Sequence, residues 1–332
     1  MNDSTTSAVS AEGLVKRFGR PGSDLVTAVA GIDLEVRRGE VFGVLGPNGA
    51  GKTTTLSMLA TLLPIDGGRA SIFGVDVASS PHQIRQLVGV TGQYASVDEN
   101  LTARENLYLF GRLLGLGRSR ARATADDLLG RFDLEEAAGR QIKNFSGGMR
   151  RRLDLAASLI AQPPLIFLDE PTTGLDPRTR GQMWDTIREL VVNGSTILLT
   201  TQYLDEADQL ADRIAVIDRG RKVAEGTSDQ LKSSVGVSTL HVRLEHRDRT
   251  TDAATIVERV LDEKPVLTPE AGGLNIALPD PNRAADVLIA LRQAELSIAT
   301  ATVRQPTLDE VFLALTGHHS DTDTHDDREE VA

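Results

Sequence analysis

The sequence predicts an α/β fold in two parts: a larger domain organised around a strand, a glycine-rich loop and a helix, and a smaller α+β domain after it. Three observations indicate this arrangement. The apolar segment 41–45 runs into a loop with three glycines, and the residues that follow have apolar spacing that suits a helix. A second apolar segment, 164–168, ends in two carboxylates. The composition changes at 232–236, and short strand and helix patterns follow that change.

The first residues predict a polar lead-in followed by a pair of antiparallel strands. Residues 1–10 lack both the basic start and the apolar core of a secretion signal, so we expect a disordered segment there. Residues 13–18 and 28–36 have strand patterns, with the turn at 19–24 between them. The larger domain is therefore expected to span residues 11–235.

The loop after the first central strand has the complete phosphate-loop pattern. It consists of Gly46, Pro47, Asn48, Gly49, Ala50, Gly51, Lys52 and Thr53, and Thr54 continues it into the helix. A loop that holds several phosphate charges needs backbone N–H groups that point inward and no side chains in the way, which glycine allows. Lys52 places a positive charge on the outer phosphates, and the Thr53 hydroxyl is placed to bind Mg²⁺. A glycine-rich turn that binds nothing is the alternative, and the flanking strand and helix argue against it.

Two further segments supply chemistry that such a site needs. Asp169 and Glu170 end a short apolar strand, and two adjacent acids there are costly without a cation, which Mg²⁺ would provide. We expect Asp169 to hold the metal and Glu170 to orient or deprotonate the attacking water. Ser146, Gly147 and Gly148 stand at a predicted helix start, where backbone N–H groups attract phosphate.

The phosphate loop, the Ser-Gly-Gly segment and the acidic strand occur in the order and spacing of the ATP-binding subunits of ABC transporters, and residues 11–231 resemble that family. The resemblance implies a P-loop nucleotide-binding domain of ABC type with an antiparallel β subdomain and an α-helical subdomain, the latter at about 95–161. It also implies that ATP and Mg²⁺ are bound and that two such domains pair head to tail. The Ser-Gly-Gly signature of one domain then closes over the ATP of the other, so the active unit needs a second copy or a related subunit.

The same resemblance assigns roles to four other side chains. Phe18 aligns with the aromatic residue that stacks on adenine, although an ordinary core phenylalanine has the same pattern. Gln93 stands where the family has a glutamine that reaches the metal and the attacking water, and Asp176 where an aspartate helps to shape the partner's site. Gln202 stands where most of the family has a histidine near the γ-phosphate. Because an amide cannot carry charge or move a proton, we expect slower turnover, with Glu170 carrying more of the work.

The residues from about 95 to 161 have helical patterns. Thr102 and Glu105 form a capping box that predicts a helix start. The apolar side chains that follow lie on two helix faces, formed by Leu107, Phe110, Leu113 and Leu114 and by Leu128, Leu129 and Phe132. Apolar faces of this kind are typical of grooves that receive helices of a membrane subunit. Ordinary packing between helices produces the same pattern.

Three segments narrow the resemblance to ATPases of the daunorubicin-resistance, drug-exporting type and extend it over nearly the whole chain. They are residues 90–98, 200–208 and 308–317. This type implies export of a hydrophobic compound, typically an antibiotic, through a separate membrane permease, and a peripheral position on the cytoplasmic face of the cell membrane. An importer ATPase and a lipid or polyketide exporter share the core motifs and stay as alternatives. A soluble ATPase acting on nucleic acid or ribosomes is a further alternative, although such proteins generally have two fused nucleotide domains or a long coiled-coil insertion.

The composition argues against several classes of protein. The net charge of −11 and the pI near 5.1 disfavour a nucleic-acid partner, and we expect the short arginine run at 150–152 to be a solvated helix face. The absence of cysteine excludes disulfides and thiol chemistry. The apolar runs fall far short of the ~20 residues that a membrane-spanning helix needs, so we expect any permease to be a separate polypeptide.

Residues 236–317 predict a small α+β domain whose pattern resembles a ferredoxin-like sandwich. The expected strands are 239–244, 274–278 and 297–303, and the expected helices are 253–261, 283–294 and 308–316. Because this segment has no cluster of catalytic type, we expect a regulatory or dimer-stabilising role. Residues 318–332 predict an acidic disordered tail, and a metal site at its histidines, His318, His319 and His325, is the alternative.

Overall fold

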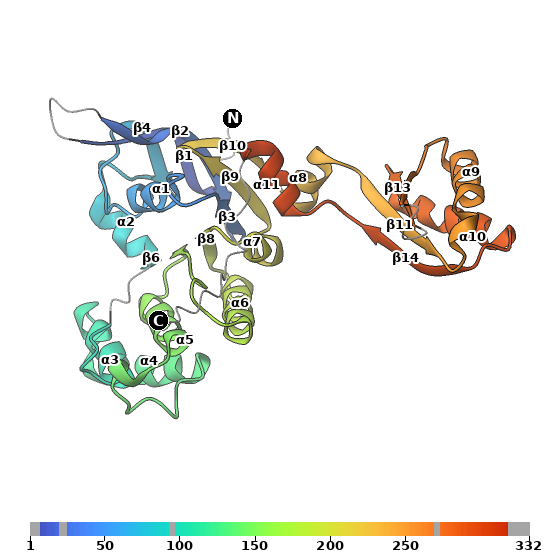
Figure 1. The fold of residues 1–332 in the computed structure, drawn as a ribbon. Coiled ribbons are helices and arrows are strands. Elements are labelled where there is room, and N and C mark those ends of the chain that lie inside the picture. Colours follow the sequence, from blue (N-terminus) through green and yellow to red (C-terminus); the bar gives the residue numbers. More distant parts are fainter. Residues whose placement is uncertain (1–6, 20–24, 93–96, 269–272, 318–332) are drawn as a thin grey trace, which may run out of the picture. The chain divides into compact units, whose positions relative to one another are not determined.

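The computed structural model describes residues 7–19, 25–92, 97–268 and 273–317. These residues form two compact units that divide between Ser228 and Asp229 (Figure 1). The composition change at 232–236 lies a few residues after this division, at the end of helix α8 (Ser228–Val235). The polar sequence of α8 conceals the helix, since Leu231 is the residue that it buries.

The centre of the first unit is a six-stranded sheet in the order β10-β9-β3-β8-β7-β6. Its strands are β3 (Val41–Leu45), β6 (Val88–Thr91), β7 (Leu165–Asp169), β8 (Thr196–Thr201), β9 (Arg213–Asp218) and β10 (Arg221–Gly226). Neighbouring strands are parallel, except that β10 runs antiparallel to β9. All residues of β3, β7 and β8 are buried, as expected of parallel strands that are covered on both faces.

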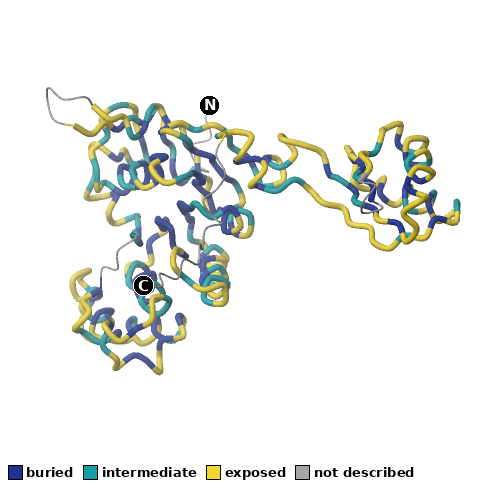
Figure 2. Tube along the Cα trace, in the orientation of Figure 1, coloured by how far each residue is buried: buried dark blue, intermediate teal, exposed yellow. Residues whose placement is uncertain are grey.

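Successive residues of the central strands enter two different cores, because side chains alternate across a strand. Phe167 of β7 packs with Phe42 and with Leu56 of α1 (Lys52–Leu59) on one face of the sheet. Its neighbour Leu168 packs on the other face, together with Leu153 of α5 (Gly147–Ser158). Buried segments run along these central strands in Figure 2. The ends of the strands are thereby held rigidly between two layers, which suits a site at the edge of the sheet.

A second sheet, of four antiparallel strands in the order β2-β1-β4-β5, shares a core with α1. Its strands are β1 (Ser7–Phe18), β2 (Val26–Arg37), β4 (Gly67–Ile72) and β5 (Val75–Asp76). Strand β1 begins at Ser7, and both Ala8 and Val9 are buried. The expectation that disorder extends to residue 10 is therefore wrong for residues 7–10, which pair with β2 and β4.

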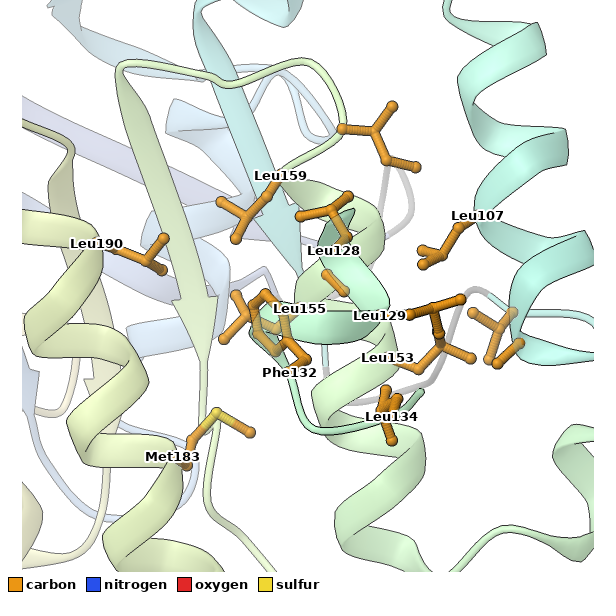
Figure 3. Close-up of a cluster of buried hydrophobic side chains, with 14 of the residues drawn as sticks. Leu107, Leu128, Leu129, Phe132, Leu134, Leu153, Leu155, Leu159, Met183 and Leu190 are labelled. Atoms are coloured by element: carbon orange, nitrogen blue, oxygen red, sulfur yellow. The ribbon is translucent and has the colours of Figure 1, made fainter. Parts of the chain in front are cut away.

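The predicted helical part contains α3 (Ala103–Leu113), α4 (Arg118–Arg131), the short 3₁₀ helix η1 (Ile142–Asn144) and α5. The capping box of Thr102 and Glu105 at the start of α3 is confirmed. In Figure 3, buried leucines of α3, α4 and α5 gather with Met183 and Leu190 of α6 (Pro177–Val192). Leu113 and Leu114, in contrast, are 73% and 54% exposed, so packing within the unit does not account for them.

Helices α2 (Pro81–Leu87), α6 and α7 (Leu204–Leu210) complete the first unit. Pro177 occupies the first turn of α6, where its missing N–H costs nothing. In the part of the chain that the structure describes, no helix combines the length and the apolar character needed to span a membrane.

The second unit has the β-α-β-β-α-β order of a ferredoxin-like arrangement. It contains β11 (Ser238–Leu244), α9 (Thr250–Leu261), β12 (Val266–Thr268), β13 (Gly273–Leu278), α10 (Ala284–Gln293) and β14 (Ile298–Arg304), and its sheet order is β12-β13-β11-β14. Two short 3₁₀ helices, η2 (Arg247–Arg249) and η4 (Pro281–Arg283), precede α9 and α10. Strand β12 is missing from the sequence-based prediction because three residues are too few to show a strand period.

The last described helix, α11 (Leu308–Thr316), lies where the sequence predicts it and begins with a capping box of Thr307 and Glu310. It belongs to the second unit. The expected acidic tail with its three histidines lies outside the described residues.

Candidate nucleotide-binding site

The phosphate loop connects β3 to α1, and two of its glycines are required by close neighbours. A Cβ on Gly46 would lie 2.2 Å from the carbonyl oxygen of Ile217, and a Cβ on Gly51 would lie 2.4 Å from that of Ala28. Gly51 also has a φ of 102°, and Gly49 one of 79°, which favour glycine. At Gly46 and Gly51 the backbone of the protein itself therefore already requires glycine, whether or not the loop holds phosphate.

Lys52 links the loop to the acidic strand. Its buried Nζ donates hydrogen bonds to the carbonyl oxygens of Gly46 (2.7 Å) and Pro47 (3.1 Å) and lies 3.5 Å from Oε1 of Glu170. Burial lowers the pKa of Lys52, and the charges of Glu170 and Asp169 oppose this shift. The ammonium group is therefore held next to the carboxylate that was expected to act on water.

Thr53 and Asp169, the two described members of the predicted metal site, are in direct contact. The Thr53 hydroxyl donates to Oδ1 of Asp169 at 3.0 Å, across 116 residues of sequence. The hydroxyl of Thr200 donates to the same carboxylate oxygen. A hydroxyl and a carboxylate oxygen side by side form a hard-oxygen donor set, which fits Mg²⁺.

Thr200 is a site residue that the sequence analysis does not single out. It lies directly opposite Asp169 in the parallel pairing of β7 and β8. Its carbonyl oxygen and its hydroxyl accept from the backbone N–H of Glu170 at 3.0 and 3.2 Å. The signal that could have revealed it is the strand register, which places a hydroxyl-bearing residue beside the acidic pair.

Glu170 stands in a strained turn directly after β7. Its φ is +49°, a left-handed conformation that side-chain-bearing residues rarely adopt, and its side chain is buried. Such conformations persist only where the surroundings hold them, and they concentrate at functional sites. The hydroxyl of Thr173 donates to Oε2 of the Glu170 carboxylate at 3.3 Å.

The Ser-Gly-Gly segment begins α5, as predicted. Ser146 is the N-cap residue, and its hydroxyl accepts from the N–H of Met149. Ser146 and Gly147 are exposed, whereas a Cβ on Gly148 would lie 2.5 Å from Cγ2 of Thr179 in α6. The starts of α5 and α6 therefore lie against each other.

Asp176 caps that neighbouring helix. Its exposed carboxylate accepts from the backbone N–H groups of Arg178 and Thr179 at 3.1 Å and from the Thr179 hydroxyl at 2.6 Å. These hydrogen bonds, that of the Thr179 side chain foremost, lower the pKa of Asp176. Through Thr179, the structure brings Asp176 together with Gly148, a link that the sequence alone does not show.

Three predicted site residues remain: Phe18, Gln202 and Gln93. Phe18 is 42% exposed, and the centroid of its ring lies 5.6 Å from Nζ of Lys16. It is therefore not a core phenylalanine. Gln202 is half-buried and follows β8 directly, at the edge of the sheet where Glu170 follows β7. Gln93 lies outside the described residues, and Gly92 is the last described residue before it.

Comparisons with known proteins identify the family. A family model described as ABC transporter matches residues 29–173. The daunorubicin/doxorubicin resistance ATP-binding protein DrrA of Streptomyces peucetius is 51% identical over 321 residues, which cover 97% of this chain and 96% of that protein. The chain belongs to the ABC transporter family. It is an ATP-binding subunit and an ATPase.

Other ABC proteins agree with this assignment. The doxorubicin resistance ATP-binding protein DrrA of Mycobacterium tuberculosis (strain ATCC 25618 / H37Rv) is 42% identical, with 96% of each chain covered. A solved ATP-binding subunit of an ABC transporter is 29% identical, with a TM-score of 0.60, and the match covers 68% of this chain and 92% of that one. The ATP-binding cassette MJ0796, solved as a dimer bound to ADP and Pi, is 25% identical, with a TM-score of 0.61 and coverage of 66% and 98%.

The structure corrects the expectation for the arginine run of this ABC ATPase. Arg150, Arg151 and Arg152 are all half-buried, so they do not form a solvated face. Arg150 pairs with Glu99, and Arg152 donates to the carbonyl oxygen of Phe132. Arg151 points to the backbone of the acidic strand and donates to the carbonyl oxygens of Asp169 and Glu170. A run of like charges conceals these different environments, because burial depends on position around the helix.

Glu206 of α7 is a second buried group that the sequence analysis does not single out. Its Oε1 accepts from the hydroxyl of Thr172 at 2.8 Å and from Nε1 of Trp184 at 3.3 Å. Glu206 therefore joins α7 to α6 and to the loop that follows Glu170. Its position four residues after Gln202 in the chain is the one sequence signal that relates it to the site.

Proposed function

We propose that this ABC ATPase hydrolyses ATP at a site formed by the loop 46–54, Asp169 and Glu170, with Glu170 as the general base. The observation that carries the proposal is the meeting of the two motifs: Thr53 bonds to Asp169, and Lys52 lies against Glu170. A buried lysine between loop carbonyls and a carboxylate is placed to exchange these partners for phosphate oxygens. Glu170 is then left to accept a proton from water.

Thr53 and Asp169 are the residues that would hold Mg²⁺, and the family resemblance adds Gln93 to this set. When bound, the ion neutralises phosphate charge. Thr200 fixes the carboxylate of Asp169 and the backbone N–H of Glu170 at once, so it aligns the two acids with each other. We further propose that exposed Phe18 stacks on adenine and that the amide of Gln202 donates to the γ-phosphate.

We propose that a second copy of this chain completes the site in trans. Ser146 and Gly147 begin α5, Asp176 begins α6, and all three are exposed. Because Gly148 contacts Thr179, these residues belong to one surface at two adjoining helix starts, where backbone N–H groups favour an anion. The dimeric form of MJ0796 supports such a pairing.

The role of Glu170 as general base is tested by comparing the ATPase rate and the ATP binding of Glu170→Gln with those of the wild type. The amide keeps the size of the side chain but cannot accept a proton, so we expect the ATPase rate to fall about 10²–10⁴-fold with ATP binding retained. Steady-state kinetics and binding of a fluorescent ATP analogue measure the two quantities. A Glu170→Gln protein with the wild-type rate would exclude Glu170 as the general base.

We also propose that the ATPase energises export of a hydrophobic drug or antibiotic through a separate membrane permease, at the cytoplasmic face of the cell membrane. The names of the DrrA relatives support this cargo, and their similarity extends over 97% of the chain in one case. The exposed Leu113 and Leu114 at the end of α3 offer an apolar surface for a membrane partner.

Affinity purification of the tagged chain from gently solubilised membranes of its host tests the export proposal. We expect a polytopic membrane protein in fixed ratio to the ATPase. Deletion of that permease should then raise sensitivity to its cargo, and Glu170→Gln should do the same. Recovery with ribosomes, or without a membrane protein, would contradict export. Loss of uptake of a nutrient in the deletion strain would instead indicate an importer.

A further inference from the structure

Arg151 of helix α5 donates hydrogen bonds to backbone carbonyl oxygens in two separate segments of the chain beside the site. Its Nη1 donates to Gly92 at 2.6 Å, at the end of β6. Its Nη2 donates to Asp169 at 3.1 Å and to Glu170 at 2.6 Å, at the end of β7. Its Nε donates to Pro171 at 3.1 Å.

These carbonyl groups lie where the parallel strands end. Thr91 of β6 pairs with Leu168 of β7, so Gly92, which follows β6, comes beside Asp169, the last residue of β7. Beyond this edge the strand ladder no longer supplies donors, and buried carbonyl oxygens need partners. The planar guanidinium group presents five N–H donors in a fixed fork, which lets one side chain serve several acceptors.

The contact with Glu170 has a special consequence because that residue is strained. Its backbone N–H is held by Thr200 of β8, and its carbonyl oxygen is held by Arg151 of α5. The φ of +49° at Glu170 is therefore fixed from two sides. Because the carboxylate position depends on this backbone, loosening either side moves the group that faces Lys52.

The charge of Arg151 is maintained by its surroundings. Burial lowers the pKa of the guanidinium group, and nearby carboxylates, that of Asp154 foremost, oppose this shift. A guanidinium group keeps its proton under all ordinary conditions. Arg151 is thus a permanent cation that adds charge assistance to each hydrogen bond.

We propose that Arg151 is a positioning residue that ties the signature helix α5 to the backbone of Glu170, so that helix and general base hold one common geometry. The inference rests on the role proposed for Glu170. It deepens that role, because α5 is the helix whose start, Ser146, is proposed to meet the ATP of a second copy. Movement of α5 in one chain would reach the base of the same chain through the hydrogen bonds of Arg151 to the carbonyl oxygens of Asp169, Glu170 and Pro171.

The test measures kcat, KM and ATP binding for Arg151→Ala, Arg151→Lys and a matched control, Arg150→Ala. Arg150 precedes Arg151 on the same helix, but its guanidinium donates to the carboxylate of Glu99 and to the backbone carbonyl oxygen of Lys143, which lie outside the acidic strand. We expect kcat of Arg151→Ala to fall about tenfold to a hundredfold, the size of effect that a small misplacement of a reacting group causes. KM and ATP affinity should stay within twofold, and Arg150→Ala should resemble the wild type.

Two further measurements separate positioning from a structural effect. Millimolar guanidinium should restore part of the rate of Arg151→Ala but none of the rate of Glu170→Gln. The double variant Arg151→Ala/Glu170→Gln should be no slower than Glu170→Gln alone, because both changes act through one group. If Arg151→Ala does not fold, Arg151→Lys decides the question, since a single ammonium cannot serve four carbonyl oxygens and we expect a folded, slow enzyme.

The inference is overturned if folded Arg151→Ala or Arg151→Lys keeps the wild-type kcat, or if ATP binding falls in step with kcat. A Glu170→Gln variant with normal activity would defeat the proposed function of Glu170 independently of Arg151. Loss of activity in Glu170→Gln together with normal activity in the Arg151 variants would defeat the inference alone.

Discussion

Glu206 is a fully buried carboxyl group beside the site, and its environment favours the protonated form. Burial raises its pKa, against the hydrogen bonds from Thr201, Thr172 and Trp184. A carboxyl group in this state can bind its neighbours without the cost of a buried charge. Its hydrogen bonds join α7 to Trp184 of α6 and to Thr172, two residues after Glu170.

This shift predicts a pH dependence of stability. A pKa raised above that of the unfolded chain gives a stabilising contribution that is complete below the ordinary value near 4.5 and is lost as the pH rises through the folded-state pKa. Glu206→Gln keeps an oxygen acceptor and carries no charge. We expect its Tm to lie closest to that of the wild type near pH 5 and to exceed it increasingly toward pH 8, by roughly 2–4 °C for each kcal/mol of charge burial removed.

Thermal unfolding between pH 5 and pH 8 measures this effect, with the exposed Glu189→Gln as the control. A Glu206→Gln protein that is less stable than the wild type at pH 8 and equal to it at pH 5 would show that the charged carboxylate is the form that the fold holds.

Individual residues of the site differ in how far the sequence reveals them. Lys52, Thr53, Asp169 and Glu170 are predictable because phosphate and metal chemistry demands these residue types at these spacings. Thr200, in contrast, acts through a position opposite Asp169 that only the strand register defines. The same is true of Arg151 and Glu206, whose partners belong to other elements.

Among the elements, helices and strands with a clear apolar period are predictable, and short or polar ones are not. The capping boxes at Thr102 and Thr307 identify the starts of α3 and α11. Helix α8 escapes prediction because it buries little more than Leu231, and β12 because it has three residues. Parallel pairing also joins strands far apart in sequence, so the sheet order does not follow from local patterns.

The close approach of α5 and α6 leads to a prediction about Gly148. A Cβ at this position would lie 2.5 Å from Cγ2 of Thr179, so we expect Gly148→Ala to destabilise the protein by about 1–3 kcal/mol through overpacking. Thr179→Ser removes that methyl group and keeps a hydroxyl for Asp176. The double variant should therefore recover most of the loss, as measured by urea unfolding.

Gly181→Ala in α6 is the matched control, because no heavy atom lies within 4 Å of its added Cβ. There we expect unchanged or slightly higher stability, since alanine favours a helix by about 0.5–1 kcal/mol over glycine. Equal destabilisation of Gly148→Ala with and without Thr179→Ser would mean that the Thr179 methyl group is not the obstacle.

In the part of the chain that the structure describes, the second unit has an apolar core of its own, separate from the two cores of the first unit, which contains the candidate site. Among the described residues, the two cores of the first unit extend no further along the chain than Ile217, and the core of the second unit runs from Leu240 to Ile298. The core of the second unit draws on both of its helices, α9 and α10, and on its sheet. Each unit therefore holds the apolar contacts that its own folding requires.

This separation predicts that the fragment 236–306, which contains β11 to β14, folds by itself. A domain of this size buries about 60% of its unfolded surface and is marginally stable, so we expect a cooperative but modest thermal transition by circular dichroism. Val257→Asp places an unpaired charge in the centre of its core and should abolish the transition. The exposed Thr255→Asp on the same helix should preserve it. A fragment without a cooperative transition, despite a folded full-length chain, would show that the second unit depends on residues outside 236–306.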